Sequence, residues 1–262
     1  MKILAIISSG RKKGHTAKMV SLLQAKLEEL AIEFKDLIQF ENLFLIDYKI
    51  NHCIGCRTCM DISEDECPLR DDIPKIKARM KDADAVVFAS PVYVGDVNSA
   101  MKALIDRLAY MCHRQEFYEK CVIILATTNA TSLKRTIRTI GAATYSWGFK
   151  TIGTKGFKTV TSNDSIETLK ERYLSDISKL ALKLYEGVRK KLYLNPSVIS
   201  LASFKVQQKY RANPELSSSI DYNYWNLRGW TDKKENYYIQ IKVSFLKKII
   251  SRLLFSLLYI IF

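Results

Sequence analysis

Four of the six cysteines lie in one stretch, residues 53–67, which reads CIGCRTCMDISEDEC. Their spacing is C-x2-C-x2-C-x7-C, at Cys53, Cys56, Cys59 and Cys67. Three thiolates on one tight loop and a fourth just downstream can close around a [4Fe–4S] cubane, and Gly55 permits the bend. Tetrahedral zinc also takes four thiolates, although zinc sites usually set two C-x2-C pairs well apart. The spacing favours a cluster and leaves free thiols and zinc open.

The composition is that of a globular chain with a large positive charge. The chain has 262 residues, of which 48% are apolar and 26% charged, and its formal net charge is +14. These values exclude a disordered or fibrous chain. The charge indicates an anionic partner: a phosphorylated cofactor, a lipid surface or nucleic acid. No secretory signal follows Met1, so we expect a cytoplasmic protein, where clustered thiols are seldom disulfides.

Strands and helices that alternate along the chain must position these thiols. Apolar runs predict buried strands at 2–7, 84–89 and 121–127, each followed by helical periodicity. Between the first two runs we predict strands near 32–38 and 43–48 and a helix starting at Asp72-Ile73-Pro74, with Asp72 as N-cap. This alternation predicts an α/β fold, a doubly wound parallel sheet whose ligands bind at the carboxyl ends of the strands.

The loops after these three strands carry small and polar residues. SSGRKKGHTAK (8–18) places glycines and hydroxyl groups before a helix, an arrangement that attracts phosphate. SPVYVG (90–95) offers backbone and one aromatic ring to a planar ligand, and TTNATS (127–132) is suited to contact a ring edge. Each loop taken alone is also compatible with an ordinary tight connection.

The order of these motifs resembles the flavodoxin-like NADPH-dependent FMN reductase family, over roughly residues 1–160, and CIGCRTC with CPLRDD resembles its iron–sulfur flavoprotein branch. The resemblance implies that FMN is the cofactor and that its phosphate is held by Ser9, Arg11, His15 and Thr16. His15 departs from the Asn usual in the family. The same resemblance assigns the ribityl chain and ring to Pro91, Val92, Tyr93, Val94 and Gly95, and the ring edge to Thr127, Thr128 and Asn129.

The implied activity is an NAD(P)H-dependent flavin oxidoreductase that passes electrons through FMN, and through a [4Fe–4S] cluster if the four cysteines hold one, to an unknown acceptor. This chemistry needs no catalytic acid or base, since the cofactor performs the redox reaction. The alternatives are a cluster-free FMN or quinone-type reductase, and an electron carrier that serves a protein partner or a membrane. The family also implies a homo-oligomer. Cys112 and Cys121 are expected to be core thiols.

A C-terminal extension, residues 193–262, follows the flavodoxin-like domain at 1–192. A last domain helix is predicted at 166–192, ended by Asn195-Pro196. The extension is basic and contains the aromatic segment DYNYWNLRGW (221–230), which we expect to pack on the domain or on a partner subunit. An RNA-binding surface is disfavoured, because no nucleic-acid motif accompanies the charge.

The chain ends in KVSFLKKIISRLLFSLLYIIF, an amphipathic helix with one polar and basic stripe. Its uncharged part, 253–262, is too short to cross a bilayer. The pattern predicts either peripheral contact with a membrane through 243–262, at the inner face, or docking on protein. The polar stripe contains Ser244, Lys247, Lys248, Ser251 and Arg252.

Overall fold

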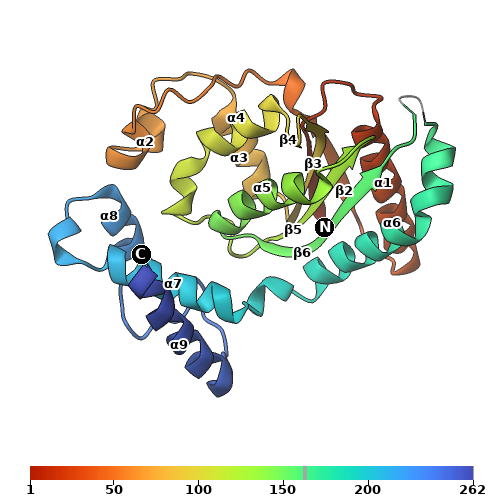
Figure 1. The fold of residues 1–262 in the computed structure, drawn as a ribbon. Coiled ribbons are helices and arrows are strands. Elements are labelled where there is room, and N and C mark those ends of the chain that lie inside the picture. The colour runs from red at the N-terminus through yellow and green to blue at the C-terminus, as the bar shows by residue number, and fades with distance from the viewer. Residues whose placement is uncertain (162–163, 262) are drawn as a thin grey trace.

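A computed structural model describes residues 1–161 and 164–261 of the chain. Its centre is a parallel sheet with the strand order β2-β1-β3-β5-β6, to which β4 adds by pairing antiparallel with β3 (Figure 1). Discounting β4, this is the flavodoxin-like order, which confirms the predicted fold class. The strands are β1 (Lys2–Ile7), β2 (Gln39–Phe44), β3 (Ala85–Tyr93), β4 (Asp96–Val97), β5 (Cys121–Thr128) and β6 (Lys150–Lys158).

Helices cover both faces of the sheet. Helices α1 (His15–Glu33) and α6 (Ile166–Arg189) pack on one face, and α3 (Ile73–Asp82), α4 (Ser99–Arg107) and α5 (Leu133–Ser146) on the other (Figure 1). Strand β3 alternates between the two layers: Val86 and Phe88 face the second set of helices, whereas Val87 faces the first. Burial on both faces explains why β3 and β5 appear in the sequence as continuous apolar runs.

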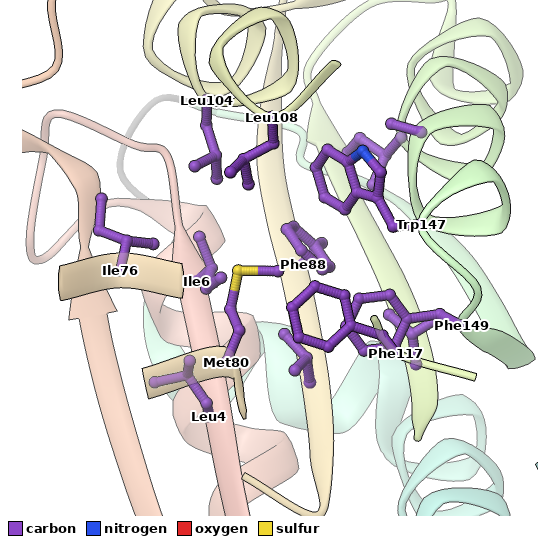
Figure 2. Packing of buried hydrophobic residues seen from close by; sticks show 14 of the residues in the cluster. Leu4, Ile6, Ile76, Met80, Phe88, Leu104, Leu108, Phe117, Trp147 and Phe149 are labelled. Carbon is purple, nitrogen blue, oxygen red and sulfur yellow. The ribbon is translucent and has the colours of Figure 1, made fainter. Parts of the chain in front are cut away.

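Aromatic rings fill the core between the sheet and α5. Phe117 stacks on Phe149 with ring centroids 4.5 Å apart, and Phe88 lies 6.0 Å from Trp147 (Figure 2). All four side chains are buried. Truncating such a ring to Ala costs about 3–5 kcal/mol, so this cluster holds the sheet that carries the loops of interest.

The region between β1 and β3 differs from the prediction. The strands expected near 32–38 and 43–48 are replaced by the single strand β2 at Gln39–Phe44, because α1 continues to Glu33 and Ala31 belongs to its buried face. Helix α3 begins as predicted, with Pro74 in its first turn, but the Asp72 side chain does not cap it. Asp71 accepts from the Ile73 amide instead, while Asp72 accepts from the Lys49 amide.

Two further elements were not anticipated. Strand β6 was not predicted, and the short strand β4 precedes the helix expected after the second apolar run. Short helical segments complete the domain: α2 (Thr58–Asp61) and the 3₁₀ turns η1 (Leu45–Asp47), η2 (Glu64–Glu66) and η3 (Ala109–Cys112). A further turn, η4 (Leu192–Leu194), spans the boundary with the extension. Cys121 is a buried core thiol as expected, whereas Cys112 is only half-buried.

The extension is helical and packs on the domain. It contains α7 (Val198–Arg211), η5 (Pro214–Leu216), α8 (Ile220–Leu227) and α9 (Phe245–Ile261), and α8 lies beside α2 (Figure 1). Trp225 is fully buried and donates from Nε1 to the His113 carbonyl at 2.8 Å. The expected packing of the aromatic segment on the domain is therefore confirmed. Among the described residues, no helix has the length and apolarity needed to cross a membrane.

Candidate functional site

The loops singled out in the sequence meet at the carboxyl edge of the sheet. A cavity of about 120 Å³ opens there between the ends of β1, β3 and β5. Of the residues expected to bind FMN, all line this cavity except Val94 and Gly95. Thr16 and Thr127 join two of the loops, with their Oγ1 atoms 2.7 Å apart. The lining residues are Ser9, Arg11, His15, Thr16, Pro91, Val92, Tyr93, Thr127, Thr128, Asn129 and Thr159.

The loop before α1 is shaped like an anion cradle. The Ser9 hydroxyl accepts from the Arg11 amide at 3.2 Å, and the Gly14 amide donates to the Arg11 carbonyl at 3.0 Å, so the loop turns tightly onto the helix. A Cβ on Gly14 would come within 3.1 Å of the Arg11 carbonyl oxygen. No side chain of the described residues caps the N-terminus of α1, and its first turn contains no acidic residue. Such a terminus attracts anions.

His15 supplies an unused polar atom beside this cradle. Its Nε2 is buried and has no hydrogen-bond partner among the residues that the structure describes. Burial lowers the pKa of His15; Asp164 opposes this, while the positive charges of Lys18 and Arg11 add to it. A buried nitrogen without a partner is costly, and an oxygen of a bound phosphate would satisfy it. The cradle therefore fits the phosphate of FMN.

The two expected residues that do not line the cavity form a strained turn next to it. Val94 and Gly95 connect β3 to β4 with φ of 48° and 84°. Positive φ at both central positions is the pattern of a type I′ hairpin turn, which suits Asn and Gly. A β-branched residue in the left-handed region is a genuine outlier, and such strain gathers at functional sites. The Val94 side chain is fully exposed to solvent.

The four clustered cysteines line a second, larger cavity of about 590 Å³. Gly55 has φ of 68°, as the predicted bend requires. The Cys56 thiol accepts from the Thr58 hydroxyl at 3.3 Å, and this bond lowers the pKa of Cys56. Burial raises the pKa of Cys59, and neighbouring Cys67 and Cys53 raise it further. Within the described part of the chain, no three His, Cys, Asp or Glu side chains converge closely enough to hold a single metal ion.

Arg107 of α4 forms hydrogen bonds and an ion pair beside these thiols. Its Nη2 donates to Cys67 Sγ at 3.6 Å and to the Leu69 carbonyl at 3.3 Å. Its Nη1 pairs with Asp71, whose side chain is fully buried. Four thiols around one cavity, with a guanidinium donating to one sulfur, form a donor set that suits a [4Fe–4S] cluster, in which each thiolate binds a different iron.

Two of the four carboxylates between the third and fourth cysteines form ion pairs. Asp61 bonds to Arg57 at 2.9 Å, and Glu64 contacts Lys77 at 3.4 Å and Arg114 at 3.2 Å. Carboxylates close to a cluster would lower its reduction potential. The structure shows positive charges next to two of them, which reduces that effect.

A known protein family matches most of the flavodoxin-like domain. The model of the family described as NADPH-dependent FMN reductase matches residues 1–155, more than half of the chain. The chain belongs to this family. It is thus an FMN-dependent oxidoreductase with a flavodoxin-like fold, which confirms the family resemblance found in the sequence.

Curated relatives of this family member are iron–sulfur flavoproteins. One from Archaeoglobus fulgidus is 29% identical over 88% of the chain and 100% of its own length. Another, from Methanocaldococcus jannaschii, is 37% identical over 41% of the chain and 51% of its own length. The chain is therefore similar to the branch that the cysteine motif suggested, and the first of these relatives matches it beyond the domain and into the extension.

Solved structures agree on the fold. A flavone reductase superposes with a TM-score of 0.55 at 17% identity, covering 72% of this chain and 63% of its own. An FMN-dependent NADH-azoreductase of Bacillus anthracis, in complex with FMN, superposes with a TM-score of 0.51 at 13% identity, covering 71% of this chain and all of its own.

Several residues at these cavities could not be found from sequence. Thr159 lines the first cavity but follows β6, a strand that was not recognised. Asn98 caps α4 and donates from Nδ2 to the Ser8 carbonyl at 2.6 Å, which ties the loop after β1 to the hairpin. An Asn before a helix signals a cap, but its contact with Ser8 depends on the fold. Arg107 lies in a segment that the family resemblance covers, yet nothing local indicates its contact with Cys67.

Proposed function

We propose that this FMN-dependent oxidoreductase takes electrons from NADH or NADPH and passes them through FMN and a [4Fe–4S] cluster to an acceptor. The observation that carries the proposal is that almost all the residues expected at FMN line one cavity while all four clustered cysteines line another. When bound, FMN can accept a hydride from a nicotinamide and release electrons one at a time.

The side chains of this chain bind and orient rather than react. Arg11, His15 and Thr16 would hold the phosphate at the N-terminus of α1, where the helix dipole favours an anion. Tyr93 lines the cavity and is about half exposed (53%), so its ring is available to a planar ligand. Thr127 and Thr128, at the end of β5, would border the ring edge.

Anaerobic purification tests the cofactors. We expect flavin absorption, broad absorption near 400 nm, and about four irons per chain, the content of one [4Fe–4S] cluster. Cys56→Ser should lose iron, whereas Cys112→Ser, a matched change outside the motif, should retain it. Flavin without iron in the unaltered protein would leave the cluster-free reductase as the function. Absence of bindable FMN would overturn the proposal altogether.

Neighbouring basic residues offer a matched pair for the phosphate site. Arg11 lines the first cavity, whereas Lys12 pairs with Asp47 at 2.8 Å and does not line it. Arg11→Gln should weaken FMN binding about tenfold or more, the loss of a charge-assisted contact, and Lys12→Gln should leave it nearly unchanged. NADH and NADPH oxidation by the FMN-loaded protein then separates an enzyme from an electron carrier with little turnover. Sizing by light scattering tests the expected homo-oligomer.

We also propose that α9 makes peripheral contact with a membrane. Ser251 on its polar stripe is buried toward the body of the extension, while the apolar face points to solvent, with Phe245 79% and Leu253 64% exposed. Helix α9 does dock on protein, as the alternative from sequence predicted, because it packs on α7. It docks through its polar stripe, so its apolar face stays exposed. The exposed apolar side chains of α9 are Phe245, Leu246, Ile249, Ile250 and Leu253.

Positive charge lies at the start of this helix. A cavity of about 200 Å³ at the start of α9 is lined by Lys242 and Lys247. Lys247 donates from Nζ to Asn195 Oδ1 at 2.5 Å, and nearby Lys150 donates to the Asn195 carbonyl at 3.1 Å. Burial lowers the pKa of Lys150, and the charge of Lys247 lowers it further. Lysines beside an exposed apolar helix face favour an anionic lipid surface as the occupant.

Vesicle flotation tests this contact. The full chain should float with vesicles that contain phosphatidylglycerol and less with pure phosphatidylcholine. Leu246→Ser with Ile250→Ser should abolish flotation, whereas Leu216→Ser, an exposed apolar residue of η5, should not. If flotation is absent and the double variant instead dissociates a dimer, the face joins two copies of the chain and the membrane proposal is wrong.

A further inference from the structure

A buried guanidinium joins the extension to the cysteine segment. Arg114 is 1% exposed, and its Nη1 donates to Asp221 Oδ1 of α8 at 2.5 Å. Its Nη2 donates to the carbonyl of Cys59 and to Glu64 Oε2, the latter at 3.2 Å. One side chain of the domain therefore contacts both the C-terminal extension and the backbone of a clustered cysteine.

Asp221 is held firmly on the extension side. Its Oδ2 lies 2.8 Å from His113 Nδ1 and 3.4 Å from Arg211 Nη2. Helix α8 is fixed to the same segment of the domain by Trp225, which bonds to the His113 carbonyl, and by Tyr224, whose hydroxyl donates to the Gln115 carbonyl at 2.7 Å. The carboxylate thus faces Arg114 from a helix whose following turn is anchored to the domain.

Arg114 depends on these partners to keep its orientation. Its Nε is buried without a hydrogen-bond partner among the described residues, so the two terminal nitrogens carry its polar contacts. Its guanidinium also lies over the Tyr110 ring at 5.1 Å. If the Asp221 charge is removed, Glu64 is the carboxylate that still pairs with the buried Arg114 guanidinium. Glu64 is partly exposed and also pairs with Lys77. A buried charge that loses its partner forces local rearrangement.

We propose that the C-terminal extension is a clamp on the cysteine segment, in which Asp221 orients Arg114 and Arg114 positions the backbone of Cys59. Asp221 and Arg114 are positioning residues, since neither touches a sulfur. Helix α8 lies beside α2, which carries Cys59, so the clamp acts where the two helices meet. The geometry of one thiol at the larger cavity then depends on a part of the chain outside the flavodoxin-like domain. The clamp rests on the proposed function in one respect: the proposed function names the group that the thiols bind.

The test measures thiol accessibility in the full chain, reduced and free of iron. In Asp221→Asn, alkylation of Cys59 by iodoacetamide, followed by peptide mass spectrometry, should be about tenfold faster, because protection falls as local opening becomes easier. Amide exchange of residues 58–64 should accelerate in parallel. Cys121, buried in β5, should stay protected in the same sample. Glu215→Gln, an exposed acidic residue of the extension, is the matched control and should change neither rate.

A conservative variant distinguishes positioning from general stability. Asp221→Glu should restore most of the protection of Cys59, since it keeps the carboxylate. If Asp221→Asn also exposes Cys121 to alkylation, the variant has unfolded the domain, and Arg114→Lys becomes the deciding variant. One ammonium cannot bind both the Asp221 carboxylate and the Cys59 carbonyl. In Arg114→Lys, alkylation should therefore accelerate at Cys59 and not at Cys121. Equal Cys59 rates in the unaltered protein and in the deciding variant would overturn the clamp. Lack of iron in the native protein would overturn the cluster and leave these rates unaffected.

Discussion

Arg107 Nη2 donates to Cys67 Sγ across 3.6 Å while its Nη1 pairs with buried Asp71. One guanidinium thus neutralises a carboxylate of the loop and faces a sulfur of the motif. The Asp71 side chain is fully buried, and its Oδ2 also accepts from the Asn51 amide at 2.9 Å. The pair fixes both ends of the segment between Asn51 and Asp71 against α4.

Arg107→Met should lower the free energy of unfolding by about 3–5 kcal/mol, because it leaves the Asp71 charge buried without its partner. Denaturant unfolding of the reduced protein measures the change. The double variant with Asp71→Asn should recover much of the loss, since no buried charge then remains. If the single variant loses less than about 1 kcal/mol, as for a surface pair, the pair is not buried in solution.

Val94→Asn should stabilise the β3–β4 hairpin by about 1 kcal/mol, because Asn tolerates the left-handed conformation that Val94 adopts. Thermal unfolding without FMN measures this gain. If the Val94 side chain contacts the flavin ring, as the family resemblance implies, the same variant binds FMN more weakly, so stability and affinity change in opposite directions. A stabilised variant with unchanged FMN affinity would show that the Val94 side chain does not contact the flavin and that the turn contributes only backbone atoms to FMN binding.

Folding stability should depend on the protonation of His113. The hydrogen bond that His113 donates to Asp221 is the main cause that raises the pKa of His113 to about 9, from an unfolded value near 6.5. The raised pKa means that the folded state binds the proton more tightly, so this contribution is complete below about pH 6.5 and is lost as pH rises through about 9. Urea unfolding at pH 6, 8 and 10 measures it. In His113→Gln the free energy of unfolding should decrease less between pH 6 and pH 10. An identical decrease in the variant would show that other groups cause it.

FMN binding should raise the pKa of His15. Burial is the main cause that lowers this pKa, and a phosphate anion at Nε2 would stabilise the protonated ring. FMN affinity should therefore fall as pH rises through the bound-state pKa. Riboflavin, which has the same ring without the phosphate, should show no such dependence. NMR titration of the His15 ring with each ligand measures both effects, and equal pKa values would place the phosphate elsewhere.

The loops at the carboxyl edge could be predicted because they follow strands with clear apolar patterns. Ser9, Pro91 and Thr127 each lie at the end of such a run or within two residues after it, and the sheet brings them together. Strand β6 could not be predicted in this way. It is an edge strand whose sequence, KTIGTKGFK, mixes lysines and glycines, a composition that edge strands tolerate and central strands do not.

The contacts around the cysteines could not be predicted, because they form between segments that are far apart in the sequence. Arg107 meets Cys67 and Arg114 meets Asp221 only after distant segments pack together. Each arginine sits among residues that are ordinary for a helix or a loop, and no local pattern marks its partner. The spacing of the four cysteines predicted which thiols share a cavity, while the residues that orient them became visible only in the fold.

The placement of α8 beside α2 has a consequence for how the protein is made. Residues 53–67 leave the ribosome long before Asp221 does, and domains begin to fold as they emerge. Until the last part of the chain is synthesised, the cysteine segment lacks the support of the extension. Ribosome-bound chains that end before α8 should therefore present a more open Cys59 than chains that include α8.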